Sequence, residues 1–348
     1  MHRKNMTAVY SVSHFFVDLA CAFLIFRYIA YSDNVLQLVL LYNFCAFALQ
    51  MPIGILADRF GRGHAIAAIG CGIIAAAYLT ALLNAPLVSV LAAGIGNAMF
   101  HIGGGVYVLD EYDDCGALGV FVSPGAVGLY LGTVLGRESI SSLIPVLPLL
   151  FCAVSIVMVS KLISPEDRWG RSSYNIALSI DCRKLILPAL LFFAVVCIRS
   201  FGGFAMSFEW KSGFVPGLMA VLATAGGKAA GGFFSDRLGM LLASIISMAA
   251  AALLFILSAN IISGLLALFF FNMSMPITLR AAKELFNDRR GFSFGLLTFA
   301  LFIGYIPFCI GNERPESEPV QMSVLCVISA VLLCLGLRFS KIKVKKYD

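Results

Sequence analysis

The chain has 348 residues, of which 60% are hydrophobic and 13% are charged, and its formal net charge is +6. Its mean hydropathy of +0.93 is far too high for a soluble globular protein, so the composition places the chain in a membrane. The stretches between Arg62 and Asp110 and between Leu238 and Leu279 contain no Asp, Glu, Lys or Arg. Each is long enough for two spans of about 20 residues.

Lipid offers no hydrogen-bond partner to a peptide group, so each apolar stretch must form a helix or a strand of a closed barrel. These stretches lack the apolar-polar alternation of barrel strands, which indicates helices. The sequence therefore predicts an all-α membrane protein with twelve transmembrane helices joined by short turns. Cutting the chain at its polar clusters places them at residues 7–30, 35–57, 64–83, 87–109, 115–136, 141–163, 185–206, 213–235, 240–258, 261–281, 292–311 and 320–337.

Lys and Arg residues in short loops predict which side of the membrane each loop occupies. Placing both termini in the cytoplasm puts the basic tail and most other basic loops inside, in an inner membrane of the bacterial type. The acidic turn Asp110–Asp114 is the exception. No removable signal is expected, because the first span follows the N-terminus without a cleavage site. The loops explain the positive charge, so no nucleic acid partner is expected.

The ten cysteines are scattered singly and show no C-x-x-C spacing, so they are interpreted as small packing residues. Neither a disulfide framework nor a metal site is expected from them. No cofactor is expected either.

A polar central segment, residues 164–184, separates an N-terminal half, residues 1–163, from a C-terminal half, residues 185–348. Shifting the chain by 178 residues aligns GILADRFG at 54–61 with GFFSDRLG at 232–239, and a shift of 175 aligns Asn97 with Asn272. Each pair occupies an equivalent place in its half. The sequence therefore predicts two six-helix halves related by pseudo-symmetry.

The repeated segment resembles the signature of the major facilitator superfamily, a family of membrane transporters. The matching residues are Gly54, Asp58, Arg59, Gly61 and Arg62 in the first half, and Gly232, Asp236, Arg237 and Gly239 in the second. The resemblance implies a cytoplasmic turn that helps to hold the halves together in the outward-facing state. Physically, Asp58 is expected near the N-terminus of the following helix or beside a neighbouring Arg. A simple capped turn is the alternative.

A second feature, on the fifth span, looks like the glycine-proline motif of antiporters in this superfamily. Its residues are Gly119, Pro124, Gly125 and Gly128, followed by Gly132 and Gly136. Small residues at this spacing also let helices pack closely, so generic helix packing is the competing interpretation.

Polar residues deep in four spans are the candidates for a substrate and proton cavity, since such residues are costly in lipid. They are His14 and Asp18 on the first span, Asn97 and His101 on the fourth, Arg199 on the seventh and Asn272 on the tenth. The members of the first two pairs are four residues apart and so share a helix face. In the superfamily these four spans line the central cavity. Arg27 and Lys228 lie near span ends, where their charges can reach the interface.

The His14-x-x-x-Asp18 pair with Phe100-His101 also resembles the fosmidomycin-resistance branch of the superfamily. That branch continues with Pro-Glu, whereas this chain has Ile102-Gly103.

Chemically, Asp18 is the candidate proton carrier, with His14 or His101 as its relay. Arg199 is expected to pair with Asp18 or to bind an anionic group of the substrate. A permanent structural ion pair is the alternative.

The sequence thus predicts a monomeric secondary transporter, not an enzyme, that works by alternating access in the lipid bilayer. It is expected to move a small organic anion or a drug with protons, with efflux favoured and uptake by symport as the alternative. A membrane enzyme is disfavoured because no H-E-x-x-H, G-x-S-x-G or P-loop pattern is present. A receptor is disfavoured because the loops leave little docking surface.

Overall fold

The computed structural model describes residues 2–138, 140–162, 182–287, 289–310 and 316–340. These residues form helices, and their only β-type pairing is an isolated bridge between Met206 and Ser317. The predicted central segment up to residue 181 and the last eight residues of the basic tail, 341–348, lie outside the described residues.

The chain folds into two compact units whose boundaries do not follow chain order. Unit 1 comprises Met1–Glu111, Pro124–Ser172 and Arg289–Phe299, and unit 2 comprises Tyr112–Ser123, Ser173–Asp288 and Ala300–Asp348. Two helices are divided between the units, namely α6 (Cys115–Arg137) and α13 (Arg290–Tyr305). The first turns of α6 belong to unit 2 and its remainder to unit 1. The first turns of α13 belong to unit 1 and its remainder to unit 2.

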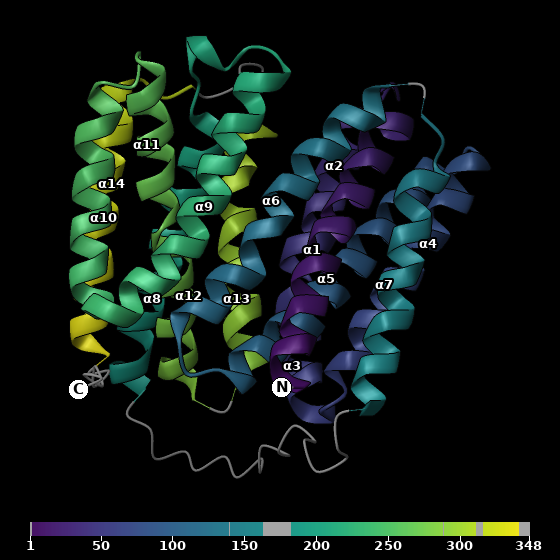
Figure 1. Ribbon diagram of the computed structural model, residues 1–348, viewed down its shortest axis with the longest axis horizontal. Helices are drawn as coiled ribbons and strands as arrows, with labels where there is room; N and C mark the ends of the chain where they lie inside the picture. The colour runs from purple at the N-terminus through teal and green to yellow at the C-terminus, as the bar shows by residue number, and fades with distance from the viewer. Residues whose placement is uncertain (1, 139, 163–181, 288, 311–315, 341–348) are drawn as a thin grey trace. The chain divides into compact units, whose positions relative to one another are not determined.

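The other helices, whose α-helical members are labelled in Figure 1, belong to one unit each. Unit 1 contains α1 (His2–Leu24), η1 (Ile25–Ile29), α2 (Val35–Asn43), η2 (Phe44–Ala48), α3 (Gln50–Phe60), α4 (Gly63–Leu82), α5 (Pro86–Glu111) and α7 (Leu143–Leu162). Unit 2 contains α8 (Cys182–Ala205), η4 (Glu209–Lys211), α9 (Phe214–Leu238), α10 (Met240–Ile256), α11 (Ile261–Asn272), α12 (Ser274–Phe286), η5 (Ile306–Phe308) and α14 (Pro319–Phe339).

Eleven helical segments of the described chain are long and apolar enough to cross a membrane, and the shorter apolar helix α10 is the twelfth. Each corresponds to one predicted span, with ends that differ by a few residues. The first span, for example, is Met6–Ile29, where 7–30 is predicted. The prediction of an all-α protein with twelve apolar helices is therefore confirmed for the described residues.

One span is broken in the middle. The segment Ile261–Phe286 consists of α11 and α12, which meet at Met273. The cause is Pro276, because a proline ring clashes with the carbonyl group four residues earlier, here that of Asn272, and cannot donate to it. At the other end of α11, the Asn260 side chain accepts hydrogen bonds from the amides of Ile262 and Ser263 and so caps the helix.

In unit 1, α4 packs against α5 and α7, and α1 packs against the same two helices (Figure 1). Gly70 and Gly96 allow the closest approach between α4 and α5. A Cβ atom on Gly70 would lie 2.5 Å from the Gly96 carbonyl oxygen, and one on Gly96 would lie 2.6 Å from that of Gly70. Small residues let helix backbones meet in lipid, where no hydrophobic force drives helices together.

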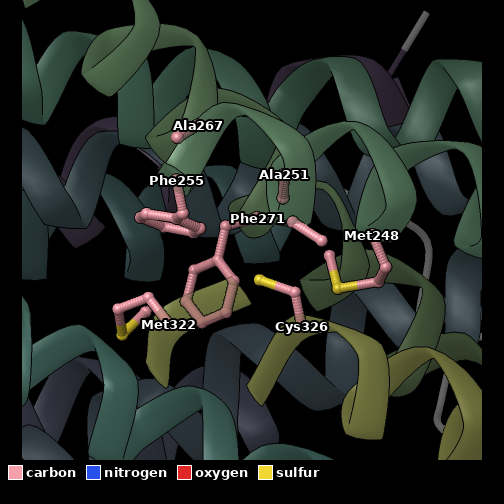
Figure 2. Packing of buried hydrophobic residues seen from close by; sticks show 8 residues of the cluster. Met248, Ala251, Phe255, Ala267, Phe271, Met322 and Cys326 are labelled. Carbon is pink, nitrogen blue, oxygen red and sulfur yellow. The ribbon is translucent and has the colours of Figure 1, made fainter. Parts of the chain in front are cut away.

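Unit 2 has an apolar core between α10, α11 and α14 (Figure 2). Phe255 and Phe271 meet edge to face there, with ring centroids 5.8 Å apart, and the sulfur-containing side chains of Met248, Met322 and Cys326 surround them. Nine cysteines have described side chains; six of these are buried, and all nine are free thiols.

Candidate functional site

Four of the predicted cavity residues form a polar cluster inside unit 1. His14 and Asp18 lie one turn apart on α1, with Nε2 of His14 3.3 Å from Oδ2 of Asp18. His101 on α5 reaches both, because its Nε2 lies 2.9 Å from Nε2 of His14 and 3.7 Å from Oδ1 of Asp18. The two imidazole rings meet edge to face. Spacing on each helix explains the pairs, and the packing of α1 against α5 brings the pairs together.

Asn97 on α5 forms hydrogen bonds with two members of this cluster. Its backbone carbonyl oxygen lies 2.9 Å from Nδ1 of His101, and its side-chain amide donates to Oδ1 of Asp18 at 3.4 Å. A carbonyl oxygen can only accept a hydrogen bond, so Nδ1 of His101 carries a proton. In the neutral ring the lone pair is therefore on Nε2, the atom that faces His14 and Asp18.

The glycines of α6 form the surface on which α1 packs. A Cβ atom on Gly125 would overlap Nε2 of His14 and would lie 2.5 Å from Oδ2 of Asp18. Further along α6, Cβ atoms on Gly128 and Gly132 would run into the carbonyl oxygens of α1 residues Phe15 and Leu19. The spacing of these glycines puts them on one helix face. These three glycines therefore lie at a close contact between α6 and α1.

The remaining part of that motif lies in unit 2. A Cβ atom on Gly119 would lie 2.6 Å from the carbonyl oxygen of Lys228 on α9. Pro124 is inside α6, close to the point at which the helix passes from one unit to the other.

Arg199 on α8 is buried in unit 2, where its side chain is 8% exposed. Its Nη1 donates to Oγ1 of Thr278 at 3.2 Å. The Thr278 hydroxyl in turn donates to backbone carbonyl groups of α12, so it meets Arg199 as an acceptor. Among the described residues of unit 2, no carboxylate lies within ion-pairing distance of Arg199.

Asn272, the sixth predicted cavity residue, ends α11 next to the break in that span. Its side-chain amide donates to the Leu268 carbonyl oxygen at 2.8 Å, within its own helix. The neighbouring Phe271 is 2% exposed and belongs to the core of unit 2, which gives it a packing role.

The first signature turn caps a distant helix. Asp58, near the end of α3, accepts hydrogen bonds from the backbone amides of Gly291 and Phe292, at 2.7 and 2.9 Å, in the first turn of α13. It thus stabilises the N-terminus of α13, and the following helix α4 is not its partner. Gly54 lies against Gly291, since a Cβ atom on either would run into the backbone of the other. Gly61 ends α3 with φ of 61°.

The second signature turn makes the same kind of contact in unit 2. Asp236, near the end of α9, accepts hydrogen bonds from the amides of Cys115 and Gly116, at 2.7 and 2.8 Å, in the first turn of α6. A Cβ atom on Gly232 would lie against the Cys115 carbonyl, and Gly239 follows α9 with φ of 80°. The basic residues of both turns, Arg59, Arg62 and Arg237, are exposed.

A family model described as the Major Facilitator Superfamily matches residues 6–308. The chain belongs to this superfamily. Among solved structures, a superfamily transporter, FucP, in the outward conformation aligns with a TM-score of 0.66 and 14% identity, covering 98% of this chain and 100% of that one. A variant of the E. coli fucose:proton symporter FucP aligns with a TM-score of 0.62 and 13% identity over the same shares.

At these identities the likeness shows the fold, which confirms the predicted major facilitator fold. A search of curated proteins found no match. As a member of the superfamily, the chain is an integral membrane transporter, and such transporters generally are not enzymes. The resemblance to the fosmidomycin-resistance branch stays a prediction.

The acidic turn of this superfamily member is matched by nearby basic side chains. Asp110 pairs with Arg290 at 2.7 Å in unit 1. In unit 2, Asp113 lies 3.2 Å from Nζ of Lys283 and 3.3 Å from Nη1 of Arg280. The hydrogen bond and charge of Lys283, supported by Arg280, lower the pKa of Asp113 below its usual 3.8. These pairs explain why an acidic turn is found in an otherwise basic set of loops.

Sequence reasoning missed the partners of the two signature aspartates. Gly291 and Cys115 each lie in the first turn of a helix, but nothing in the local sequence marks their amides as bonded to a residue so far away. It also missed the contact between Tyr10 and His64, whose hydroxyl and Nδ1 lie 2.6 Å apart. A contact between a tyrosine and a histidine on different helices cannot be predicted from the spacing of the two residues in the sequence.

Proposed function

We propose that this superfamily member is a secondary active transporter that moves a small organic anion by alternating access, with protons as the coupling ion. The observation that supports an anionic substrate is the environment of Arg199. A guanidinium group inside a membrane span is costly unless a negative charge offsets it. Within its unit, a hydroxyl group and no carboxylate faces it.

The planar guanidinium group has five N–H donors, and the Thr278 hydroxyl takes one of them. The other donors suit a carboxylate, phosphate or phosphonate, each of which can accept two parallel hydrogen bonds. Anionic solutes therefore fit Arg199 better than neutral drugs do. Asn272 supplies a further polar group on the broken span of the same unit.

Proton coupling is proposed for the cluster in unit 1. Asp18 lies deep in its span, roughly 16 Å along the helix from the beginning of the apolar segment. It has two imidazole rings beside it that can pass a proton on. In this proposal Asp18 carries the proton, His14 and His101 relay it, and Asn97 positions Asp18 and His101.

The two helix caps are proposed as the contacts that change during transport. Each consists of two hydrogen bonds from one carboxylate to the first turn of a helix, α13 for Asp58 and α6 for Asp236. Contacts of this size cost about 1–3 kcal/mol to break, which suits a step that must reverse in every cycle.

Efflux by proton antiport is the favoured direction, in line with the likeness of the α6 motif to that of antiporters. Uptake by proton symport is the second candidate, because one protein with this fold is a fucose:proton symporter. The protein is proposed to act as a monomer in a bacterial-type inner membrane, with both termini in the cytoplasm.

The testing experiment has two stages. Purified protein is first screened for thermal stabilisation by small organic anions, cations and neutral drugs, with Arg199→Gln beside the wild type. Stabilisation by one anion class that is lost in Arg199→Gln is expected. Stabilisation by cations or neutral compounds alone, unchanged in the variant, would contradict the anion proposal.

The second stage measures flux of the stabilising anion in proteoliposomes with an imposed pH gradient. Asp18→Asn is expected to abolish gradient-driven flux while the variant remains folded by size-exclusion chromatography. Undiminished gradient-driven flux would rule out Asp18 as the proton carrier. The sign of the gradient that drives accumulation separates antiport from symport.

A further inference from the structure

We propose that His14, Asp18 and His101 together bind one divalent transition-metal ion of the Zn²⁺ class. The three side chains offer two imidazole nitrogens and a carboxylate oxygen whose positions all lie within 4.8 Å of one another. The proposal does not depend on which solute is transported. A bound ion and a proton compete for the same atoms of Asp18, His14 and His101, so ion binding is tested without a pH gradient. It departs from the expectation of no metal, because the ligands come from two helices that only the fold brings together.

The distances within the cluster match those between the ligands of a small metal ion. Zn²⁺ binds nitrogen and oxygen at about 2.0–2.1 Å, so two ligand atoms of a tetrahedral site are about 3.3 Å apart. The three distances here are 2.9 Å between the imidazole Nε2 atoms, 3.3 Å from His14 to Asp18 and 3.7 Å from His101 to Asp18. The two contacts of Asp18 use different oxygens, and with a single oxygen taken for Asp18 the three ligand atoms lie within 4.8 Å of one another.

The hydrogen bond of His101 prepares it for a metal. A metal-binding histidine usually donates its other ring N–H to a carbonyl or carboxylate group, which orients the ring and leaves the lone pair on the ligand atom. The Asn97 carbonyl oxygen accepts from Nδ1 of His101 in this way, at 2.9 Å. The Asn97 side chain donates to Asp18, so one residue orients two of the three ligands.

The donor set also decides the class of metal. Imidazole nitrogens favour Zn²⁺, Co²⁺, Ni²⁺ and Cu²⁺, whereas Mg²⁺ and Ca²⁺ prefer sites built from oxygen. One carboxylate and two neutral imidazoles leave a bound dication with a net charge of +1. The side chains of Asp18 and His101 are 19% and 13% exposed, so a fourth ligand, such as water, has access to the site.

Gly125 leaves the space that the ligand atoms occupy. A Cβ atom at this position would overlap Nε2 of His14 and would crowd Oδ2 of Asp18, which are two of the three ligand atoms. The adjoining glycines of α6 meet backbone atoms of α1, whereas Gly125 meets these side chains. The absence of a side chain at residue 125 is therefore required for the arrangement that binds the metal.

Co²⁺ is the probe, because its visible absorption reports the number and geometry of its ligands. Purified protein without an affinity tag is titrated with Co²⁺ and then with Zn²⁺, in the absence of any solute or gradient. One Co²⁺ per chain with the intense absorption of a four-coordinate site, displaced by one Zn²⁺, is expected. His101→Gln and Asp18→Asn are each expected to weaken binding at least tenfold. Asn97→Ala keeps the backbone carbonyl that accepts from His101 and loses only the hydrogen bond to Asp18, so it is expected to weaken binding about tenfold.

His64→Ala is the matched control, because it removes a histidine of the same unit whose Nδ1 contacts Tyr10. This variant is expected to bind Co²⁺ like the wild type. Size-exclusion chromatography confirms that each variant is folded. Gly125→Ala removes no ligand, but its Cβ atom displaces His14 or Asp18, so this variant is expected to bind Co²⁺ more weakly than the wild type. Absence of stoichiometric binding, or binding unchanged in folded His101→Gln and Asp18→Asn, would overturn the proposal. An equal loss of Co²⁺ binding in His64→Ala would also overturn it.

Discussion

Asp58 accepts a hydrogen bond of 2.7 Å from the backbone amide of Gly291, a residue 233 positions further along the chain. A second bond, from Phe292, completes the cap of α13. One carboxylate thus satisfies two of the amides that a helix N-terminus leaves without intrahelical partners. The first prediction follows from this contact.

Replacing Asp58 with Asn is expected to lower the stability of the protein by about 1–2 kcal/mol, because an amide oxygen can accept from one backbone N–H while the NH₂ group faces the other. The change is measured as the apparent melting temperature in detergent. Arg59→Ala is the matched control, since the adjacent Arg59 is exposed and its loss is expected to cost less than about 0.5 kcal/mol. Equal melting temperatures of Asp58→Asn and the wild type would show that the cap contributes nothing.

The second prediction concerns Asp236, which belongs to the second signature copy, where Met240 stands at the position equivalent to Arg62. Its two hydrogen bonds, at 2.7 and 2.8 Å, are as short as those of Asp58. Asp236→Asn is therefore expected to lower the apparent melting temperature as much as Asp58→Asn does. Arg237→Ala serves as the control. A clearly smaller effect of Asp236→Asn would show that the cap of α6 contributes less to stability than the cap of α13.

The third prediction tests the packing of α6 against α1. Gly125→Ala is expected to cost about 1–3 kcal/mol of stability and to reduce transport, because its Cβ atom must displace His14 or Asp18. Gly72→Ala on α4 is the control, since nothing lies within 4 Å of a Cβ atom there. That control is expected to be neutral or slightly stabilising, because alanine favours a helix over glycine. Both are measured by thermal unfolding and by flux.

The fourth prediction separates stability from function at Arg199. Arg199→Met is expected to keep or raise the melting temperature, by on the order of 1 kcal/mol in stability, because it removes a buried charge that lacks a carboxylate partner within its unit. The same variant is expected to lose stabilisation by anions. A strongly destabilised Arg199→Met would instead indicate a permanent structural ion pair.

The fifth prediction is a pH dependence at the acidic turn. The pKa of Asp113 is lowered by Lys283, so the folded protein holds this carboxylate ionised to lower pH than the unfolded chain does. Its contribution to stability is present above the usual carboxyl pKa of 3.8 and is lost as the pH falls through the lowered value. The wild type is expected to lose more stability than Asp113→Asn as the pH falls from 5 to 3. The difference is expected to be small, since the Asp113 side chain is 78% exposed.

The helices could be predicted from the sequence because their cause is local. Every peptide group in lipid must be hydrogen-bonded within its own segment, so apolar length alone defines a span. The break at Met273 is local too, since it follows from Pro276 three residues later. The pairs His14 with Asp18, and Asn97 with His101, follow from the spacing along one helix.

Only the tertiary structure shows which residues on different helices contact one another. Nothing near Asp58 or Asp236 indicates that each caps a helix far along the chain, and nothing near Gly125 indicates that it leaves room for His14. Nor does the sequence near His101 indicate that this residue contacts His14 and Asp18. Each contact depends on how close two helices approach, which is set by small residues on both partners and by side-chain packing between them. The sequence by itself thus determined the spans and the polar residues inside them, and the packing of helices determined which of those residues touch.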